Sequence, residues 1–124
     1  MGRILRLSLS CHKGLCINAS VCVYVPPVSS TTKHYAAAAD LLKALSAPAR
    51  LAIVVELAER PRLVNELVDR LAMSQPLVSQ HLRVLRGARL VSVERQGREA
   101  VYSLVDQHVA HIVADAVHHS KEQT

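Results

Sequence analysis

Two pairs of potential metal ligands stand near the end of this chain of 124 residues. Asp106 and His108 form the first pair, and His119 and Glu122 form the second. Carboxylate oxygens and imidazole nitrogens bind divalent zinc at about 2.0 to 2.2 Å. In one helix, His108 and His119 return to nearly the same face but lie roughly 16 Å apart along the axis. One chain therefore cannot close the site, and two antiparallel copies of the helix can, which predicts a homodimer as well as a metal.

The helix that carries these ligands, expected from Asp106 to about Glu122, also has an apolar stripe. The residues of the stripe are Val109, Ile112, Val113, Ala116 and Val117. Around a two-fold axis, the stripe pairs with the same stripe of a second copy and brings the start of one helix to the end of the other. The pattern therefore predicts two equivalent metal sites at the dimer interface.

Each proposed ligand also has a plain structural interpretation. Asp106 can be the N-cap of the helix, and His108 a surface residue of its first turn. His119 and Glu122 can form only an i, i+3 pair on the last turn. The metal interpretation is favoured because all four residues occur together, at a spacing that suits a dimer, beside an apolar stripe.

Other side chains of the same helix compete for the metal. His108, His111 and Asp115 share one face and form an alternative site within one chain, and His118 is a further competitor. Two nitrogens and two carboxylate oxygens in a tetrahedron suit Zn(II), with Co(II) and Ni(II) as alternatives. Four protein ligands leave no open position for catalysis, and no His-Glu-x-x-His motif is present. We therefore expect a sensor and not an enzyme.

The composition is that of one small helical domain. Half of the residues are hydrophobic, Phe and Trp are absent, and the net charge is +5, so the core must be aliphatic. No apolar run reaches the length of about 18 residues that spans a bilayer, and we expect no membrane partner. The three cysteines, an odd number without a Cys-x-x-Cys pair, indicate a reducing compartment, and we expect a cytoplasmic protein.

The first part of the chain differs in composition from the rest. Residues 1–33 contain four Lys or Arg and no acidic residue, and no small-residue cleavage site of a secretory signal follows. We interpret them as a flexible basic tail, in part an over-extended start of the reading frame, and residues 34–124 as the folded domain. The alternative is a second metal site that uses Cys11, His12 or Cys16.

Four helices, a hairpin and a last helix are expected in the folded domain. The helices cover His34 to Leu45, Pro48 to about Glu59 after a Ser46 cap, Leu63 to Leu71, and Ser74 to about Arg86, with Gly87 as the stop. Alternating apolar and polar residues on both sides of Gly97 predict a β-hairpin. The fold class is mainly α with a β-hairpin wing, in the order ααααββα, which is a winged helix-turn-helix.

The fourth helix has the character of a DNA-recognition helix. Val78, Leu82 and Leu85 form its apolar stripe, and the outward set is Gln75, Ser79, Gln80, Arg83 and Arg86. From Ser74 to Arg98 there are five arginines against one glutamate, which concentrates positive charge where DNA would lie. We expect the first four outward residues to read bases, and Arg95 and Arg98 at the wing tip to contact phosphate or the minor groove.

The stretch from about Leu41 to Glu122 resembles the ArsR/SmtB family of bacterial metal-sensing repressors. The likeness is carried by ALSAPAR at 44–50, VSQHLRVL at 78–85, QGREAVY at 96–102, and the closing Asp-x-His and His-x-x-Glu pairs. It implies that Asp106 and His108 of one subunit and His119 and Glu122 of the other bind zinc. Family members with thiolate sites carry cysteines on the third helix, and this chain has none there.

The resemblance also implies a function. A zinc-responsive repressor is expected, in which the apo homodimer binds double-stranded operator DNA with an imperfect inverted repeat, and metal weakens that binding. The alternative is a winged-helix regulator that responds to nickel or cobalt, or whose last helix only dimerises and binds no metal.

Overall fold

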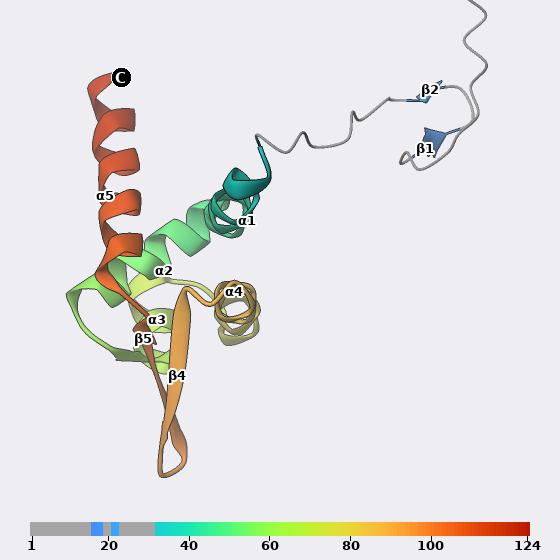
Figure 1. Cartoon of the computed structure of the whole chain (residues 1–124). Coiled ribbons are helices and arrows are strands. Elements are labelled where there is room, and N and C mark those ends of the chain that lie inside the picture. The colour runs from blue at the N-terminus through green and yellow to red at the C-terminus, as the bar shows by residue number, and fades with distance from the viewer. Residues whose placement is uncertain (1–15, 19–20, 23–31) are drawn as a thin grey trace, which may run out of the picture. The chain divides into compact units, whose positions relative to one another are not determined.

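A computed structural model of the chain describes residues 16–18, 21–22 and 32–124 (Figure 1). The chain divides into two compact units, Met1–His34 and Tyr35–Thr124. In the first unit, β1 (Cys16–Asn18) and β2 (Val21–Cys22) pair antiparallel. The predicted flexible tail and the alternative metal site near Cys11 and His12 fall mostly outside the described residues, so both stay predictions.

The second unit has the predicted order of helices and hairpin strands. Its elements, after a 3-10 turn over Lys33–Tyr35, are α1 (Ala36–Leu45), α2 (Pro48–Glu59), α3 (Val64–Leu71), α4 (Gln75–Gly87), β4 (Val91–Gln96), β5 (Glu99–Leu104) and α5 (Gln107–Glu122). The prediction of a winged helix-turn-helix is confirmed. None of the helices in the described ranges is long and apolar enough to cross a membrane.

A third strand of the sheet was not predicted. β3 (Arg62–Leu63) pairs antiparallel with β5, which places β5 between β3 and β4. Because β3 leads directly into α3, this pairing fixes the first helix of the helix-turn-helix to the base of the hairpin. The third helix consequently begins at Val64, one residue later than expected.

The serine cap expected at the start of α2 is absent, and α4 has no side-chain cap either. Ala47 is the N-cap of α2, and Ser74 occupies the N-cap position of α4 without a side-chain hydrogen bond. In each case a proline follows within the first turn, where its fixed φ favours the helix and its missing N–H costs nothing. Asp106, in contrast, is the predicted side-chain cap of α5: its Oδ1 accepts hydrogen bonds from the backbone N–H groups of His108 and Val109, at 2.9 and 3.3 Å.

The core is aliphatic, as the composition predicted. Its fully buried members come from α2, α3, α4 and α5, and include the predicted stripe of α4; they are Ile53, Val54, Leu67, Val78, Leu82, Leu85 and Val113. Burying each of these side chains contributes roughly 1.5 to 3 kcal/mol. The helix-turn-helix is therefore attached to α2 and α5 through one continuous core.

The sequence suggested that the apolar stripe of α5 forms one surface. In the structure, its residues do not all face the same surroundings. Val109 and Val113 are buried in the core of their own unit, and Val117 packs against that core. Ile112 is 38% exposed, and Ala116 is exposed as well. The part of the stripe that remains for a second copy is thus narrower than predicted, because α2 and β5 cover the other part.

Candidate nucleic-acid interface and metal ligands

The helix-turn-helix consists of α3, a short turn and α4. Ala72 adopts a left-handed conformation with φ of 51°, which ends α3 and redirects the chain within three residues. Leu67 of α3 and Val78 of α4 are both fully buried, so the two helices share one packed surface. This packing leaves the opposite side of α4 free to contact another molecule.

The predicted base-reading and phosphate-binding residues of α4 all lie on that side. Gln75, Ser79, Gln80, Arg83 and Arg86 are exposed. The predicted apolar stripe of the same helix, Val78, Leu82 and Leu85, is at most 1% exposed, whereas Leu77 and Val84 are 40% and 41% exposed. The structure therefore separates the helix into a core face and an exposed, largely polar face, which carries hydrogen-bond donors and acceptors of the types that recognise base edges and phosphates.

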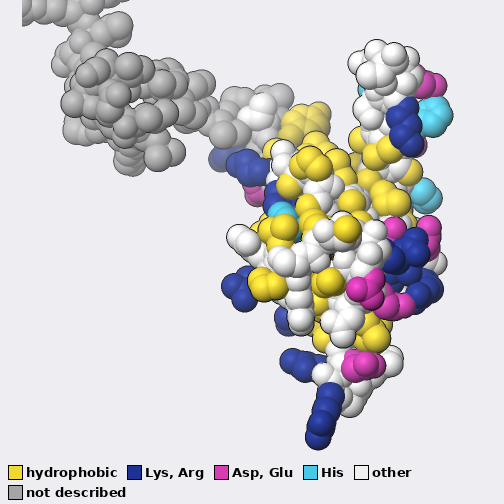
Figure 2. Space-filling view, turned by 180° about the vertical axis from the view of Figure 1, so that it is seen from behind, with side chains coloured by type: hydrophobic (Ala, Val, Ile, Leu, Met, Phe, Trp, Pro, Cys, Tyr) yellow, Lys and Arg dark blue, Asp and Glu magenta, His cyan; other side chains and the backbone are white. Residues whose placement is uncertain are grey.

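The hairpin carries the two remaining basic candidates at its end. Arg95 is opposite Ala100 in the ladder, and Gly97 has φ of 66° in the turn, a conformation that costs a glycine little. Arg95 and Arg98 are exposed. Figure 2 shows Lys or Arg side chains at this end of the hairpin, with acidic side-chain surface next to them.

The first pair of metal ligands lies at the start of α5. Asp106 and His108 have exposed side chains, and the distance from His108 Nδ1 to Asp106 Oδ1 is 3.5 Å. Both capping hydrogen bonds go to Oδ1, so the other oxygen of Asp106 can serve as a ligand while the cap stays in place. The capping and metal interpretations of Asp106 are thus compatible.

The second pair lies on the last turn of α5. His119 Nε2 lies 2.9 Å from Gln123 Nε2, and Glu122 Oε1 lies 3.6 Å from His118 Nδ1. The side chains of His118 and Glu122 are well exposed, so a metal that bound here would replace this contact at small cost. The donor set of exposed imidazoles and carboxylates fits a divalent metal.

One chain does not assemble a metal site from these groups. In the ranges that the structure covers, no three His, Cys, Asp or Glu side chains come close enough to hold an ion. The three residues of the alternative site within one chain, His108, His111 and Asp115, are not brought together in this way. The four ligands of the two pairs remain proposed residues.

An ion-pair cluster joins the helix-turn-helix to α2. Arg62 is 3% exposed, and its guanidinium lies 3.0 Å from Glu56 and 2.5 Å from Glu59. Arg70 of α3 bonds to the same Glu56, an ion pair that raises the pKa of Arg70. The sequence alone did not predict this cluster, because its members come from three different elements.

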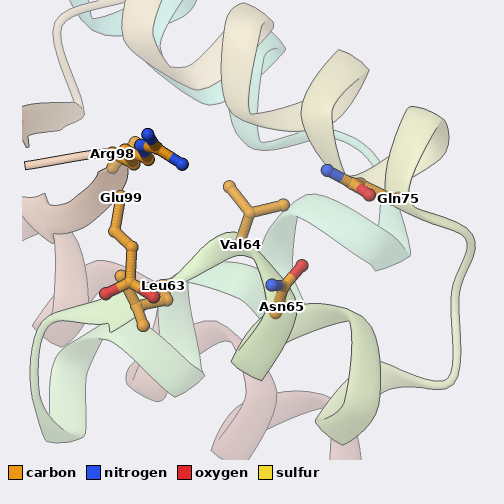
Figure 3. A pocket seen from close by; sticks show the side chains of 7 residues that line it. Leu63, Val64, Asn65, Gln75, Arg98 and Glu99 are labelled. Carbon is orange, nitrogen blue, oxygen red and sulfur yellow. The ribbon is translucent and has the colours of Figure 1, made fainter.

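A pocket that the sequence did not predict lies between α3, α4 and the hairpin. Figure 3 shows Asn65, Gln75 and Arg98 around it, with Val64 between them. The one feature of the sequence that could have indicated this pocket is the position of Asn65 in the first turn of α3. Two members of the predicted DNA-binding set, Gln75 and Arg98, thus lie at one pocket.

The fold and the polar face of α4 define a class of protein, the winged helix-turn-helix regulators. The unit resembles the homodimeric winged helix-turn-helix DNA-binding domain Mb0332 from Mycobacterium bovis, with a TM-score of 0.66 and 24% identity over 80% of this chain and 92% of that one. This likeness shows the fold.

Sequence comparison identifies the family. The family described as bacterial regulatory protein, arsR family, matches residues 47–93. The chain is 58% identical over 86 residues to the HTH-type transcriptional repressor SmtB of Mycobacterium tuberculosis, which covers 69% of this chain and 64% of the relative's length. It is 44% identical over 96 residues to the HTH-type transcriptional regulator NmtR of the same species, over 77% of this chain and 80% of the relative.

This chain therefore belongs to the ArsR/SmtB family. The family consists of transcription regulators, which confirms the prediction that the chain is not an enzyme.

Proposed function

We propose that the chain is a zinc-responsive transcriptional repressor whose apo homodimer binds operator DNA and whose metal-bound form releases it. The observation that carries the metal part is the position of two ligand pairs at opposite ends of α5, which no single chain can close. The similarity to a repressor named SmtB supports the repressor part. We further propose that residues 34–124 carry both DNA binding and dimerisation, and that the protein acts in the cytoplasm.

The DNA-binding surface is the polar face of α4 with the end of the hairpin. Its proposed residues are Gln75, Ser79, Gln80, Arg83, Arg86, Arg95 and Arg98. The α4 side chains enter the major groove, and the hairpin arginines contact the backbone beside it. A dimer presents this surface twice, so the operator should be an imperfect inverted repeat with half-sites on one side of the duplex.

The dimer interface is the exposed side of α5. Figure 1 shows the second half of α5 extending beyond the rest of its unit, and most of its side chains there are exposed. On a helix, Ile112 lies about 40° from His108 and about 20° from His119. A second α5 that runs antiparallel and covers Ile112 therefore brings His119 and Glu122 of the partner beside the first ligand pair.

The metal changes DNA affinity because it joins the two subunits in one arrangement. Each metal would bind Asp106 and His108 of one subunit and His119 and Glu122 of the other. By thermodynamic reciprocity, metal that weakens DNA binding is itself bound more weakly by the DNA complex, with a coupling of typically about 1 to 3 kcal/mol. The donor types favour Zn(II), and Co(II) and Ni(II) are the alternatives.

A second candidate function is a regulator of the same fold whose α5 dimerises without metal. It is favoured by the local partners of the proposed ligands: Asp106 caps the helix, His119 contacts Gln123, and Glu122 lies near His118. Those contacts would explain why these residues stand at these positions even in a protein that binds no metal.

A binding titration separates the two. The full chain is titrated against a labelled duplex from upstream of its own gene, first with chelator and then with Zn(II), Co(II) or Ni(II). Release by zinc at the lowest free-metal concentration supports the proposal, and release by another metal alone corrects its specificity. Binding that no metal alters supports the second candidate.

A further inference from the structure

The pocket beside the helix-turn-helix brings together side chains from three segments. Asn65 comes from the first turn of α3, Gln75 from the first turn of α4, and Arg98 from the turn of the hairpin. In Figure 3 the polar ends of these three side chains are directed toward the open space above Val64. The pocket therefore has an apolar floor and a rim of hydrogen-bond donors.

We propose that this pocket receives one sugar-phosphate unit of the DNA backbone, and that Asn65 is a DNA-contact residue. The inference rests on the DNA binding proposed above. The amides of Asn65 and Gln75 and the guanidinium of Arg98 donate to the phosphate oxygens, and Val64 packs against the deoxyribose.

The position of the pocket agrees with the way a helix-turn-helix docks. When the second helix lies in the major groove, the first helix crosses the backbone, and backbone contacts often come from helix N-termini. Asn65 is exposed in the first turn of α3. The contact also changes the role of Gln75, from reading bases to fixing the register of the protein on the duplex.

Acidic side chains limit how strongly the pocket attracts phosphate. Glu99 lines it but extends toward Leu63 in Figure 3, on the opposite side from Gln75. Glu66 of α3 is paired with Arg60 at 2.5 Å and accepts a hydrogen bond from the Leu63 N–H at 2.9 Å. Since Arg98 and Glu99 largely offset each other in charge, the neutral donors Asn65 and Gln75 decide the contact.

Substitution of Asn65 tests the assignment. For the full-length Asn65→Ala protein, the Kd should rise about threefold to tenfold, and by the same factor for the upstream fragment and for an unrelated duplex of equal length, because a phosphate contact carries no base information. Asn65→Asp, which places a charge against the phosphate, should raise it more than tenfold. Asp69→Ala, an exposed change on the same helix, is the control and should not weaken binding, and circular dichroism should show all three folded.

Backbone chemistry then locates the contact. Duplexes carry one neutral methylphosphonate at successive positions, and the wild-type protein should lose affinity at the phosphate that the pocket holds. The Asn65→Ala and Arg98→Ala proteins should lose less at that same position. An unchanged Kd for Asn65→Ala, or a loss confined to the upstream fragment, overturns the pocket assignment alone. Failure of the wild-type protein to bind either duplex overturns the proposed function, and the assignment with it.

Discussion

The guanidinium of Arg62 is buried against the carboxylate of Glu56, with its Nη2 3.0 Å from Glu56 Oε2 and its Nε 3.0 Å from the Glu56 carbonyl oxygen. The pair joins β3 to α2, and Arg70 extends it to α3. The strand that fixes the hairpin to the helix-turn-helix is thereby also fixed to the helix that packs on α5. The ion pair thus joins the strand beside the hairpin to the helix that contacts α5.

Removing Arg62 should therefore destabilise the fold strongly. Arg62→Ala leaves Glu56 half buried beside an emptied space, and the loss should approach about 3 kcal/mol, the lower end of the range for breaking a buried pair. Urea unfolding followed by circular dichroism measures it. Arg60→Ala removes an ion pair whose arginine is 55% exposed, and should cost less than about 1 kcal/mol. Equal losses of stability in the two variants would show that burial does not determine how much each ion pair contributes.

Asp106 combines a structural and a proposed metal-binding role, and three substitutions separate them. Asp106→Ser keeps a side-chain cap but removes the carboxylate, so it should retain stability and lose most of the zinc affinity. Asp106→Ala should lose both, with about 1 kcal/mol of stability for the cap. Isothermal titration calorimetry gives the affinity and thermal unfolding the stability. If Asp106→Ser binds zinc like the wild type, Asp106 is only a cap.

Local patterns predicted the elements well, because local interactions determine them. The three-to-four spacing of Val78, Leu82 and Leu85 identified the buried face of α4, and the hairpin turn was placed at Gly97. The two-residue strand β3 has too few residues to show alternation, and its partner Tyr102 is far away in the sequence. Such a strand exists because of a tertiary contact, which a sequence pattern does not contain.

The same limit applies to the functional surfaces. Periodicity placed Val109, Ile112 and Val113 on one side of α5 but could not say whether the core or a second copy covers each residue. The structure buries Val109 and Val113 and leaves Ile112 exposed. The pocket at Asn65 was missed for a related reason, since three segments meet there only after folding.

The ion pair between Arg60 and Glu66 should make stability depend on acid pH. The hydrogen bond from Arg60, with a second from the Leu63 N–H, lowers the pKa of Glu66 below its ordinary value. A carboxyl with a lowered pKa contributes stability that is present above its unfolded pKa, about 4.3, and is lost as the pH falls through the folded value. Between about pH 5 and about pH 3, the melting temperature of the wild type should therefore fall more than that of Glu66→Gln. Parallel profiles would contradict this.

The left-handed residue in the helix-turn-helix turn gives a simple stability prediction. Ala72 has φ of 51°, which costs an alanine roughly 1 to 2 kcal/mol and a glycine little. Ala72→Gly should leave stability unchanged or raise it by up to about 1 kcal/mol, after the added chain entropy of glycine in the unfolded state is subtracted. Ala114→Gly, at an exposed position inside α5, should lower it by about 1 kcal/mol. Chemical unfolding of both variants tests the contrast, and a destabilised Ala72→Gly would contradict it.

Ile112 tests whether metal binding requires the dimer. An acidic residue at this exposed position of α5 places like charges against each other in an antiparallel pair, so Ile112→Glu should shift the protein toward the monomer in analytical ultracentrifugation. Because each chain carries only half of each proposed site, zinc affinity should fall together with dimerisation, although none of the four ligands has changed. Val55→Glu, a matched change at a position 45% exposed on α2, is the control and should retain both properties. A monomeric Ile112→Glu protein that binds zinc as tightly as the wild type would mean that one chain supplies all the ligands.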